Sequence, residues 1–163
     1  MNTRQIERIL KQDFYVNPTF HGVCAIDTLP HFEYGSCVFN TAPSTKKSGH
    51  WIALYVTDST VEYFDSYGRE PSRSLKRRWW NKLWCSNVVP LQSPLSAVCG
   101  QYCIYYLLHR ARGFSMASIV MDFGGDVDLN DEMVHEFIEK RFDLNTKLLD
   151  TEGVIRQLAV ASI

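Results

Sequence analysis

The alternation of apolar and polar positions predicts short strands in the first part of the chain. Four apolar runs rich in β-branched and aromatic residues are each bounded by turn-forming residues, and we expect strands at 37–41, 51–57, 61–65 and 87–91. The second and third runs flank a turn-like tripeptide, Asp58-Ser59-Thr60. They therefore predict an antiparallel hairpin, in which the start of one strand lies beside the end of the other.

Helical spacing occurs at the amino end and again after residue 99. Thr3 is expected to cap a helix whose apolar stripe is Ile6, Ile9 and Leu10. The run 101–110 has almost no polar face, which is typical of a helix that is buried on most sides.

Two further helices are expected toward the carboxyl end. Ser115 is expected to cap a short helix that runs through Met121, and Asn130 to cap a helix over 131–142. Leu129 would pack on the second helix as a hydrophobic staple. The expected core-facing residues of that helix are Val134, Phe137, Ile138 and Phe142.

The order of these elements indicates an α+β protein. Strands that precede helices predict a mostly antiparallel central sheet packed by helices on one side, with the helix that follows Cys99 at its centre. At 163 residues and 45% hydrophobic composition, the chain can bury one sizeable core, and no linker-like stretch divides it. We therefore expect a single domain over residues 1–163.

Cys99 is the first candidate for chemistry. A cysteine attacks an acyl carbon as the thiolate, which needs a partner imidazole, a local field that favours negative charge, or both. Cys99 and Gly100 open the predicted buried helix, where backbone N–H groups stabilise a thiolate and can hold the oxyanion of a tetrahedral intermediate. Taken alone, a cysteine before an apolar helix is more often a small core residue.

Strand geometry supplies partner groups for this thiol. His50 opens the first strand of the hairpin and Asp65 ends the second, so antiparallel pairing brings both residues to one edge of the sheet. An aspartate there holds the histidine tautomer whose other nitrogen can take the thiol proton. Gln92 lies seven positions before Cys99 on a proline-bracketed loop, and its amide is a candidate second oxyanion donor.

Each of these residues also has a simpler interpretation, since a lone histidine is commonly a surface residue and a lone aspartate a turn former. The order His50, Asp65, Gln92, Cys99, with every member at the end of an element, favours a cysteine hydrolase over those interpretations. This order corresponds to a circularly permuted form of a papain-like layout.

At these residues the chain resembles the adenovirus maturation protease (adenain) family. The resemblance covers roughly residues 5–112 and is carried by the segments 20–22, 29–32, 36–42, Gly49-His50-Trp51 and Gln92 to Gly100. The wider group includes the ubiquitin-like-protein proteases. The carboxylate here is Asp65, as in those proteases, whereas the adenoviral enzymes usually have Glu.

The resemblance implies a viral or virus-derived thiol endopeptidase that cleaves capsid or core precursor proteins at glycine-containing sites. Cys99 would be the nucleophile, His50 the general base and then acid, and Asp65 the orienting group. Gln92 would be an oxyanion donor, and Trp51 would wall a narrow, glycine-selective groove. A ubiquitin-like-protein (SUMO-type) protease is the alternative enzyme, and a nucleic-acid-binding structural protein is the non-enzyme alternative.

The resemblance also implies activators. The adenoviral proteases use viral DNA and a short viral peptide, and the peptide is held by a disulfide to a cysteine upstream of the catalytic glutamine. Cys85 lies in that region, although closer to Gln92 than in the family. The sequence itself requires no cofactor and has no paired-cysteine metal spacing, so a zinc site is the weaker alternative. Such a site would use Cys99, Cys103, His109 and His135.

The net charge of −1 hides a basic segment at residues 69–82. Its basic residues Arg73, Lys76, Arg77 and Arg78 interleave with tryptophans, a composition that can contact phosphates and stack on bases, which makes DNA a candidate partner. The alternative is a solvated amphipathic helix. Its core-facing residues would be Leu75, Trp79 and Leu83.

Cysteine usage and hydropathy bear on the compartment. Five cysteines, an odd number without framework spacing, predict free thiols and a reducing environment. The charged amino end predicts no signal peptide, and no apolar run reaches ~20 residues. We therefore expect an intracellular protein in a reducing compartment, a monomer without a membrane partner. The resemblance to the adenoviral proteases implies the host nucleus or cytoplasm and the virion as its locations.

Overall fold

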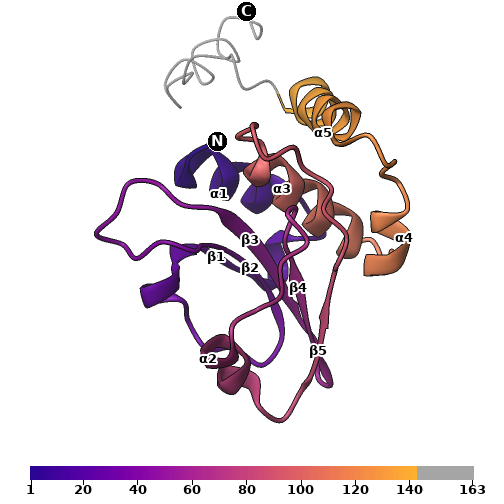
Figure 1. Cartoon of the computed structure of the whole chain (residues 1–163). Helices are drawn as coiled ribbons and strands as arrows, with labels where there is room; N and C mark the ends of the chain where they lie inside the picture. Colours follow the sequence, from indigo (N-terminus) through magenta and orange to yellow (C-terminus); the bar gives the residue numbers. More distant parts are fainter. Residues whose placement is uncertain (143–163) are drawn as a thin grey trace, which may run out of the picture.

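A five-stranded sheet forms the centre of the protein (Figure 1), and the computed structural model describes residues 1–142. Its strands lie in the order of the sequence: β1 (Phe20–Ala25), β2 (Gly35–Asn40), β3 (Trp51–Val56), β4 (Thr60–Phe64) and β5 (Leu83–Ser86). The central pairs β2–β3 and β3–β4 are antiparallel, and each edge strand runs parallel to its neighbour. The α+β class, the hairpin and the antiparallel centre of the sheet are confirmed.

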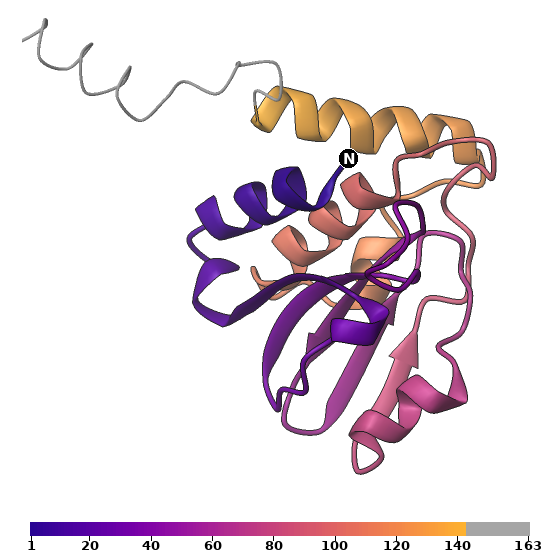
Figure 2. The same ribbon diagram turned by 90° about the vertical axis from the view of Figure 1, so that its left-hand side faces the viewer.

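A layer of helices covers one face of this sheet (Figure 2). It consists of α1 (Thr3–Gln12), α3 (Cys99–Arg110), α4 (Met116–Val120) and α5 (Val127–Arg141). Helix α3 packs on β3 and contacts each of the other three helices, which explains why it has almost no polar face. Alternate strand residues, Val38, Ala53 and Phe64, face this layer and join its core.

The opposite face of the sheet carries a second apolar core. There the intervening residues of β2 to β4 pack against Leu29, Phe32, Leu75 and Trp79. These four come from the segment before β2 and from the short helices α2 (Arg73–Lys76) and η3 (Arg77–Trp79). Two further short helices are η1 (Asn17–Thr19) and η2 (Ile26–Thr28). The sequence pattern did not reveal this second layer, because its helices are too short to show a period.

Two predicted helix caps are wrong. Asn2, not Thr3, caps α1: Asn2 Oδ1 accepts the backbone N–H of Gln5 (3.0 Å), and Gln5 Oε1 accepts the N–H of Asn2 (2.9 Å). Asp126, not Asn130, caps α5, so this helix begins at Val127. The expected staple is therefore absent, and Leu129 is 61% exposed. The predicted cap at Ser115 and the burial of Val134 and Ile138 are confirmed.

The predicted strand at 87–91 is also wrong, and β5 takes its place four residues earlier. Asn87 leaves the ladder because its side chain makes hydrogen bonds to the main chain of Asp65 and Val89. The predicted amphipathic helix ends at Trp79, and Leu83 is 68% exposed in β5 rather than buried.

The expected single domain over 1–163 includes residues 143–163, which lie outside the described residues. None of the helices within residues 1–142 is both long and apolar enough to cross a membrane.

Candidate active site

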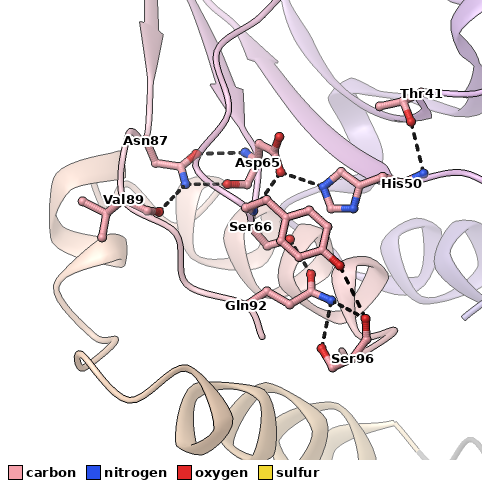
Figure 3. Close-up of polar contacts among 9 residues, drawn as sticks. Thr41, His50, Asp65, Ser66, Asn87, Val89, Gln92 and Ser96 are labelled. Carbon is pink, nitrogen blue, oxygen red and sulfur yellow. Dashed lines mark hydrogen bonds and ion pairs between the residues drawn. The ribbon is translucent and has the colours of Figure 1, made fainter. Parts of the chain in front are cut away.

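His50 lies between an aspartate and a cysteine at one edge of the sheet. Its Nε2 is 2.6 Å from Oδ1 of Asp65 (Figure 3), and the side chain of Cys99 lies close enough to the ring to raise the pKa of His50. His50 directly precedes β3, Asp65 directly follows β4, and Cys99 opens α3. Because Nε2 is engaged with Asp65, Nδ1 is the ring nitrogen left for the thiol. The structure thus brings together three of the four residues predicted from sequence.

The electrostatics of this cluster favour charge separation. Burial opposes charge on His50, but the hydrogen bonds and negative charges of Asp65 and Cys99 outweigh it and raise the pKa of His50 to about 9. Burial also disfavours the Cys99 thiolate, but the hydrogen bond from His50 and those from the backbone N–H groups of Trp51 and Gly100 lower the pKa of Cys99 below its ordinary value. Both shifts favour a thiolate–imidazolium pair.

The start of α3 explains why Cys99 differs from its neighbour Cys103. Val98, the N-cap residue, makes no side-chain capping bond, so the first N–H groups of the helix remain for the thiolate. Cys103 lies one turn further along α3, is 1% exposed, and burial raises the pKa of its thiol. Position at the helix end therefore distinguishes the Cys99 thiol, whose pKa is lowered, from the Cys103 thiol in the core, whose pKa is raised.

Asp65 is only 1% exposed and is held from several directions. Its Oδ1 also accepts the N–H of Tyr67 (2.8 Å). Asn87 Oδ1 accepts the N–H of Asp65 (2.8 Å), and Asn87 Nδ2 donates to the carbonyl of Asp65 (2.6 Å) (Figure 3). The Tyr67 ring stacks on His50, with centroids 4.5 Å apart. The carboxylate and the imidazole are therefore each held by several contacts within the protein.

Gln92, the fourth predicted residue, is buried and held by two serines (Figure 3). Ser66 Oγ donates to Gln92 Oε1 (2.6 Å), so the amide nitrogen faces the other way. Gln92 Nε2 donates to the carbonyl (3.1 Å) and hydroxyl (3.0 Å) oxygens of Ser96, three residues before Cys99. The backbone N–H groups of Leu91 and Gln92 both donate to the carbonyl of Ser66. The loop of Gln92 is thereby tied to the end of β4.

Trp51, predicted to line a substrate groove, is half-buried beside His50. Its indole Nε1 donates to the carbonyl of Met1 (3.3 Å), which places the ring against the start of α1. The ring also lines a cavity of about 280 Å³.

The basic segment does not form one continuous surface. Arg73 and Arg77 are exposed, and Lys76 pairs with Glu70. Arg78 turns inward and donates to the carbonyl of Leu29. Lys82 is 8% exposed and donates to three backbone carbonyls, so it is a structural residue rather than part of a basic face.

Sequence reasoning missed four residues that hold the site: Ser66, Tyr67, Asn87 and Ser96. Ser66 and Tyr67 lay inside a turn signal, which concealed their side-chain contacts. Asn87 lay inside an apolar run, and its low strand propensity was the available clue.

The alternative zinc site is not formed. Within residues 1–142 no group of three or more His, Cys, Asp or Glu side chains is placed to hold a metal ion. His109 Nδ1 instead contacts the carbonyl of Tyr105 (2.8 Å).

Comparisons with known proteins give similarity of structure only. No protein-family model and no curated protein sequence matches the chain. The ASFV pS273R protease is similar at a TM-score of 0.58 and 16% identity, over 82% of this chain and 66% of that one. The chain thus spans slightly less than two thirds of that protease. ChlaDub1 from Chlamydia trachomatis has a TM-score of 0.44 at 14% identity, over 65% of this chain and 57% of that one.

The SUMO protease Ulp1 has a TM-score of 0.43 at 14% identity, over 86% of this chain and 78% of that one. The similarity to the ASFV pS273R protease shows that the two chains share a fold. The predicted resemblance to the adenain family itself stays a prediction.

Proposed function

We propose that this protein is a cysteine peptidase with Cys99 as its nucleophile. The observation that carries the proposal is the position of His50 between Asp65 and Cys99, with both pKa values displaced toward a thiolate–imidazolium pair. The thiolate would attack the carbonyl carbon of a peptide bond, and His50 would then give its proton to the leaving amine. Water would hydrolyse the resulting thioester, with His50 as the base and Asp65 holding its tautomer.

The oxyanion of each tetrahedral intermediate would be held by the backbone N–H of Cys99 and by the amide of Gln92. The support for Gln92 is its fixed orientation, because Ser66 occupies Oε1 and leaves Nε2 as the donor. Substrate binding would have to draw Nε2 away from Ser96, its partner in this structure.

The proposed substrates are protein precursors cut at glycine-containing sites, such as the capsid or core precursors of a virus. Trp51 beside His50 supports a narrow groove in which glycine fits best. Viral DNA and a short peptide are proposed activators, from the family resemblance alone. Arg73 and Arg77 are available to phosphate, and Cys85 is a half-buried free thiol on the edge strand β5.

A ubiquitin-like-protein protease is a second candidate, favoured by Asp65 in the position where adenoviral enzymes usually have Glu. The nucleic-acid-binding structural protein is less well supported, because Arg78 and Lys82 are engaged with backbone carbonyls.

The test is hydrolysis of a panel of Gly-Gly peptides and ubiquitin-like fusions by purified protein. The wild type should cleave some members of the panel, and Cys99→Ala should cleave none. Cys85→Ala, a matched control at another half-buried thiol, should cleave the same members as the wild type when both are assayed without an activator peptide. Iodoacetamide should label Cys99 before the other cysteines. Hydrolysis by Cys99→Ala would overturn the proposal, and the cleaved members would distinguish the two enzyme classes.

A further inference from the structure

The cavity beside Trp51 has a lining that is basic and free of acidic residues. It has a volume of about 280 Å³ and lies where the start of α1, the strands β1 and β2, and the loop 41–49 meet. Lys46 and Lys47 line it together with hydroxyl residues such as Thr28 and Ser44. In this described part of the chain no Asp or Glu is among its lining residues. The cavity is thus suited to an anionic group.

This cavity adjoins the proposed reactive pair through a single residue. Trp51 lines the cavity, its backbone N–H lies close enough to Cys99 to lower the pKa of that thiol, and its chain neighbour is His50. A second cavity, of about 290 Å³, is lined by His50 itself but contains both charges, Arg69 and Glu70. A peptide that crosses Cys99 and continues over Trp51 therefore enters a region of one charge sign.

Lys46 and Lys47 differ from the other described lysines. Both are exposed, and neither forms an ion pair within residues 1–142. The remaining lysines of this range are all paired with glutamates: Lys11 with Glu7, Lys76 with Glu70, Lys82 with Glu33, and Lys140 with Glu136. The two lysines without an acidic partner are therefore the two that line the cavity beside the site.

The loop that carries these lysines is anchored to the rest of the protein. Asp27 accepts the N–H (2.8 Å) and the hydroxyl (2.7 Å) of Ser44, and Asn40 Oδ1 accepts the N–H of Ala42 (2.8 Å). At the other end, Thr41 Oγ1 accepts the N–H of His50 (3.1 Å). Asp27 holds the loop backbone rather than neutralising the lysines, and the loop stays beside the site.

We infer that this cavity selects substrates with an acidic side chain in the segment that lies over Trp51, where Lys46 and Lys47 would bind its carboxylate. The inference rests on the proposed peptidase function and narrows its substrate class. Exposed ion pairs are individually weak and are screened by salt, so the selectivity is expected to be moderate and salt-dependent.

The experiment is a positional scan with wild-type protein. One cleavable Gly-Gly peptide is made with a single Glu at each position in turn, and each is compared with its Gln counterpart by kcat/KM. At one position Glu should exceed Gln by roughly fivefold at low salt, and about 0.5 M salt should remove most of the difference. Equal kcat/KM values for Glu and Gln at every position would overturn the inference. A gain in kcat/KM for Glu that is the same at all positions would also overturn it, because such a gain indicates a general attraction for anions.

A charge reversal sharpens the test. The double variant K46E/K47E should prefer Lys over Glu at the same position, measured as the ratio of the two rates within one enzyme. Lys140→Glu, at an exposed lysine on α5, should keep the wild-type ratio. A double variant that still prefers Glu would overturn the inference.

The experiment distinguishes failure of the peptidase proposal from failure of the inference about acidic substrates. If no peptide is cleaved and iodoacetamide does not label Cys99 first, the peptidase proposal falls and the inference falls with it. If peptides are cleaved without a preference for Glu, only the inference falls.

Discussion

Ser66 and Ser96 together determine which way the amide of Gln92 faces. The carbonyl of Ser96 can only accept, so the amide nitrogen faces it (3.1 Å), and the Ser66 hydroxyl donates to the amide oxygen on the opposite side (2.6 Å). The order of the two groups in the chain gives no hint of this contact, because they are 26 positions apart. At the scale of single residues, the site depends on such supporting bonds as much as on its reactive atoms.

Ser66→Ala should reduce kcat roughly tenfold with little change in KM, because it releases an oxyanion donor that acts only in the transition state. Gln92→Ala should cost about 10²-fold or more in kcat. Steady-state kinetics of both variants and of the double variant check this. Ser66→Thr keeps the hydroxyl and should restore most of the rate, and the double variant should be no slower than Gln92→Ala. A Ser66→Ala effect confined to KM would contradict the assignment.

The pH dependence of hydrolysis follows from the shifted pKa values. The active form needs Cys99 deprotonated and His50 protonated, so kcat/KM should rise through the lowered pKa of Cys99 and fall as pH passes about 9, the pKa of His50. Asp65→Asn removes a charge that raises the His50 pKa, so the alkaline limb should move toward neutral pH and a weak activity should remain. A pH profile of kcat/KM is the measurement, and an unmoved alkaline limb would require another orienting group.

At the scale of elements, the pairing of neighbouring strands could be predicted from the sequence. The side-chain contacts between distant segments could not. Trp51 to Asp65 form a hairpin whose geometry places His50 and Asp65 together without any long-range assumption, and α3 was recognisable from its missing polar face. Asn87 and Asn130 were misassigned because buried side-chain bonds to distant carbonyls outweigh their local propensities. The sequence was therefore enough to predict His50, Asp65 and Cys99 as candidate residues. The residues that hold them in place could be identified only from the folded structure.

Helix α5 supports the loop that carries Gln92, although it contributes no reactive group. Asp131 Oδ1 accepts the hydroxyl of Tyr102 on α3 (2.9 Å), and Oδ2 accepts the N–H of Ser93 (3.2 Å). Asp131→Ala should leave the N–H of Ser93 unpaired, whereas the Tyr102 hydroxyl keeps the carbonyl of Leu91 as an acceptor (2.9 Å). We expect a cost of about 1–2 kcal/mol and a Tm lowered by several degrees in a thermal melt. Glu132→Ala, the exposed neighbour, should change stability by less than about 0.5 kcal/mol. Equal melting of the two variants would show that Asp131 does not brace the loop.

At the scale of the whole molecule, the sheet is covered on both faces. Some residues of the basic segment therefore hold the second core, and the others lie at the surface. The second core needs Trp79, whose indole donates to the carbonyl of Phe32 (2.6 Å), and its neighbour Arg78 is turned toward Leu29. Only some of the basic residues of this segment therefore remain at the surface. A DNA interaction would depend on that part.

Arg73 and Arg77 are exposed basic residues of the segment. The double variant R73Q/R77Q should therefore weaken binding of double-stranded DNA. If both residues contact phosphates, the slope of log K against log salt should fall in magnitude by about 2. Arg78→Gln should instead lower Tm, because it removes a bond that holds the second core. A gel-shift titration from about 50 mM salt upward, with thermal melts of the same proteins, measures both effects. Unchanged DNA affinity in R73Q/R77Q would show that the basic segment does not bind DNA. The candidates for phosphate contact would then be Lys46 and Lys47, the two lysines of residues 1–142 that have no acidic partner.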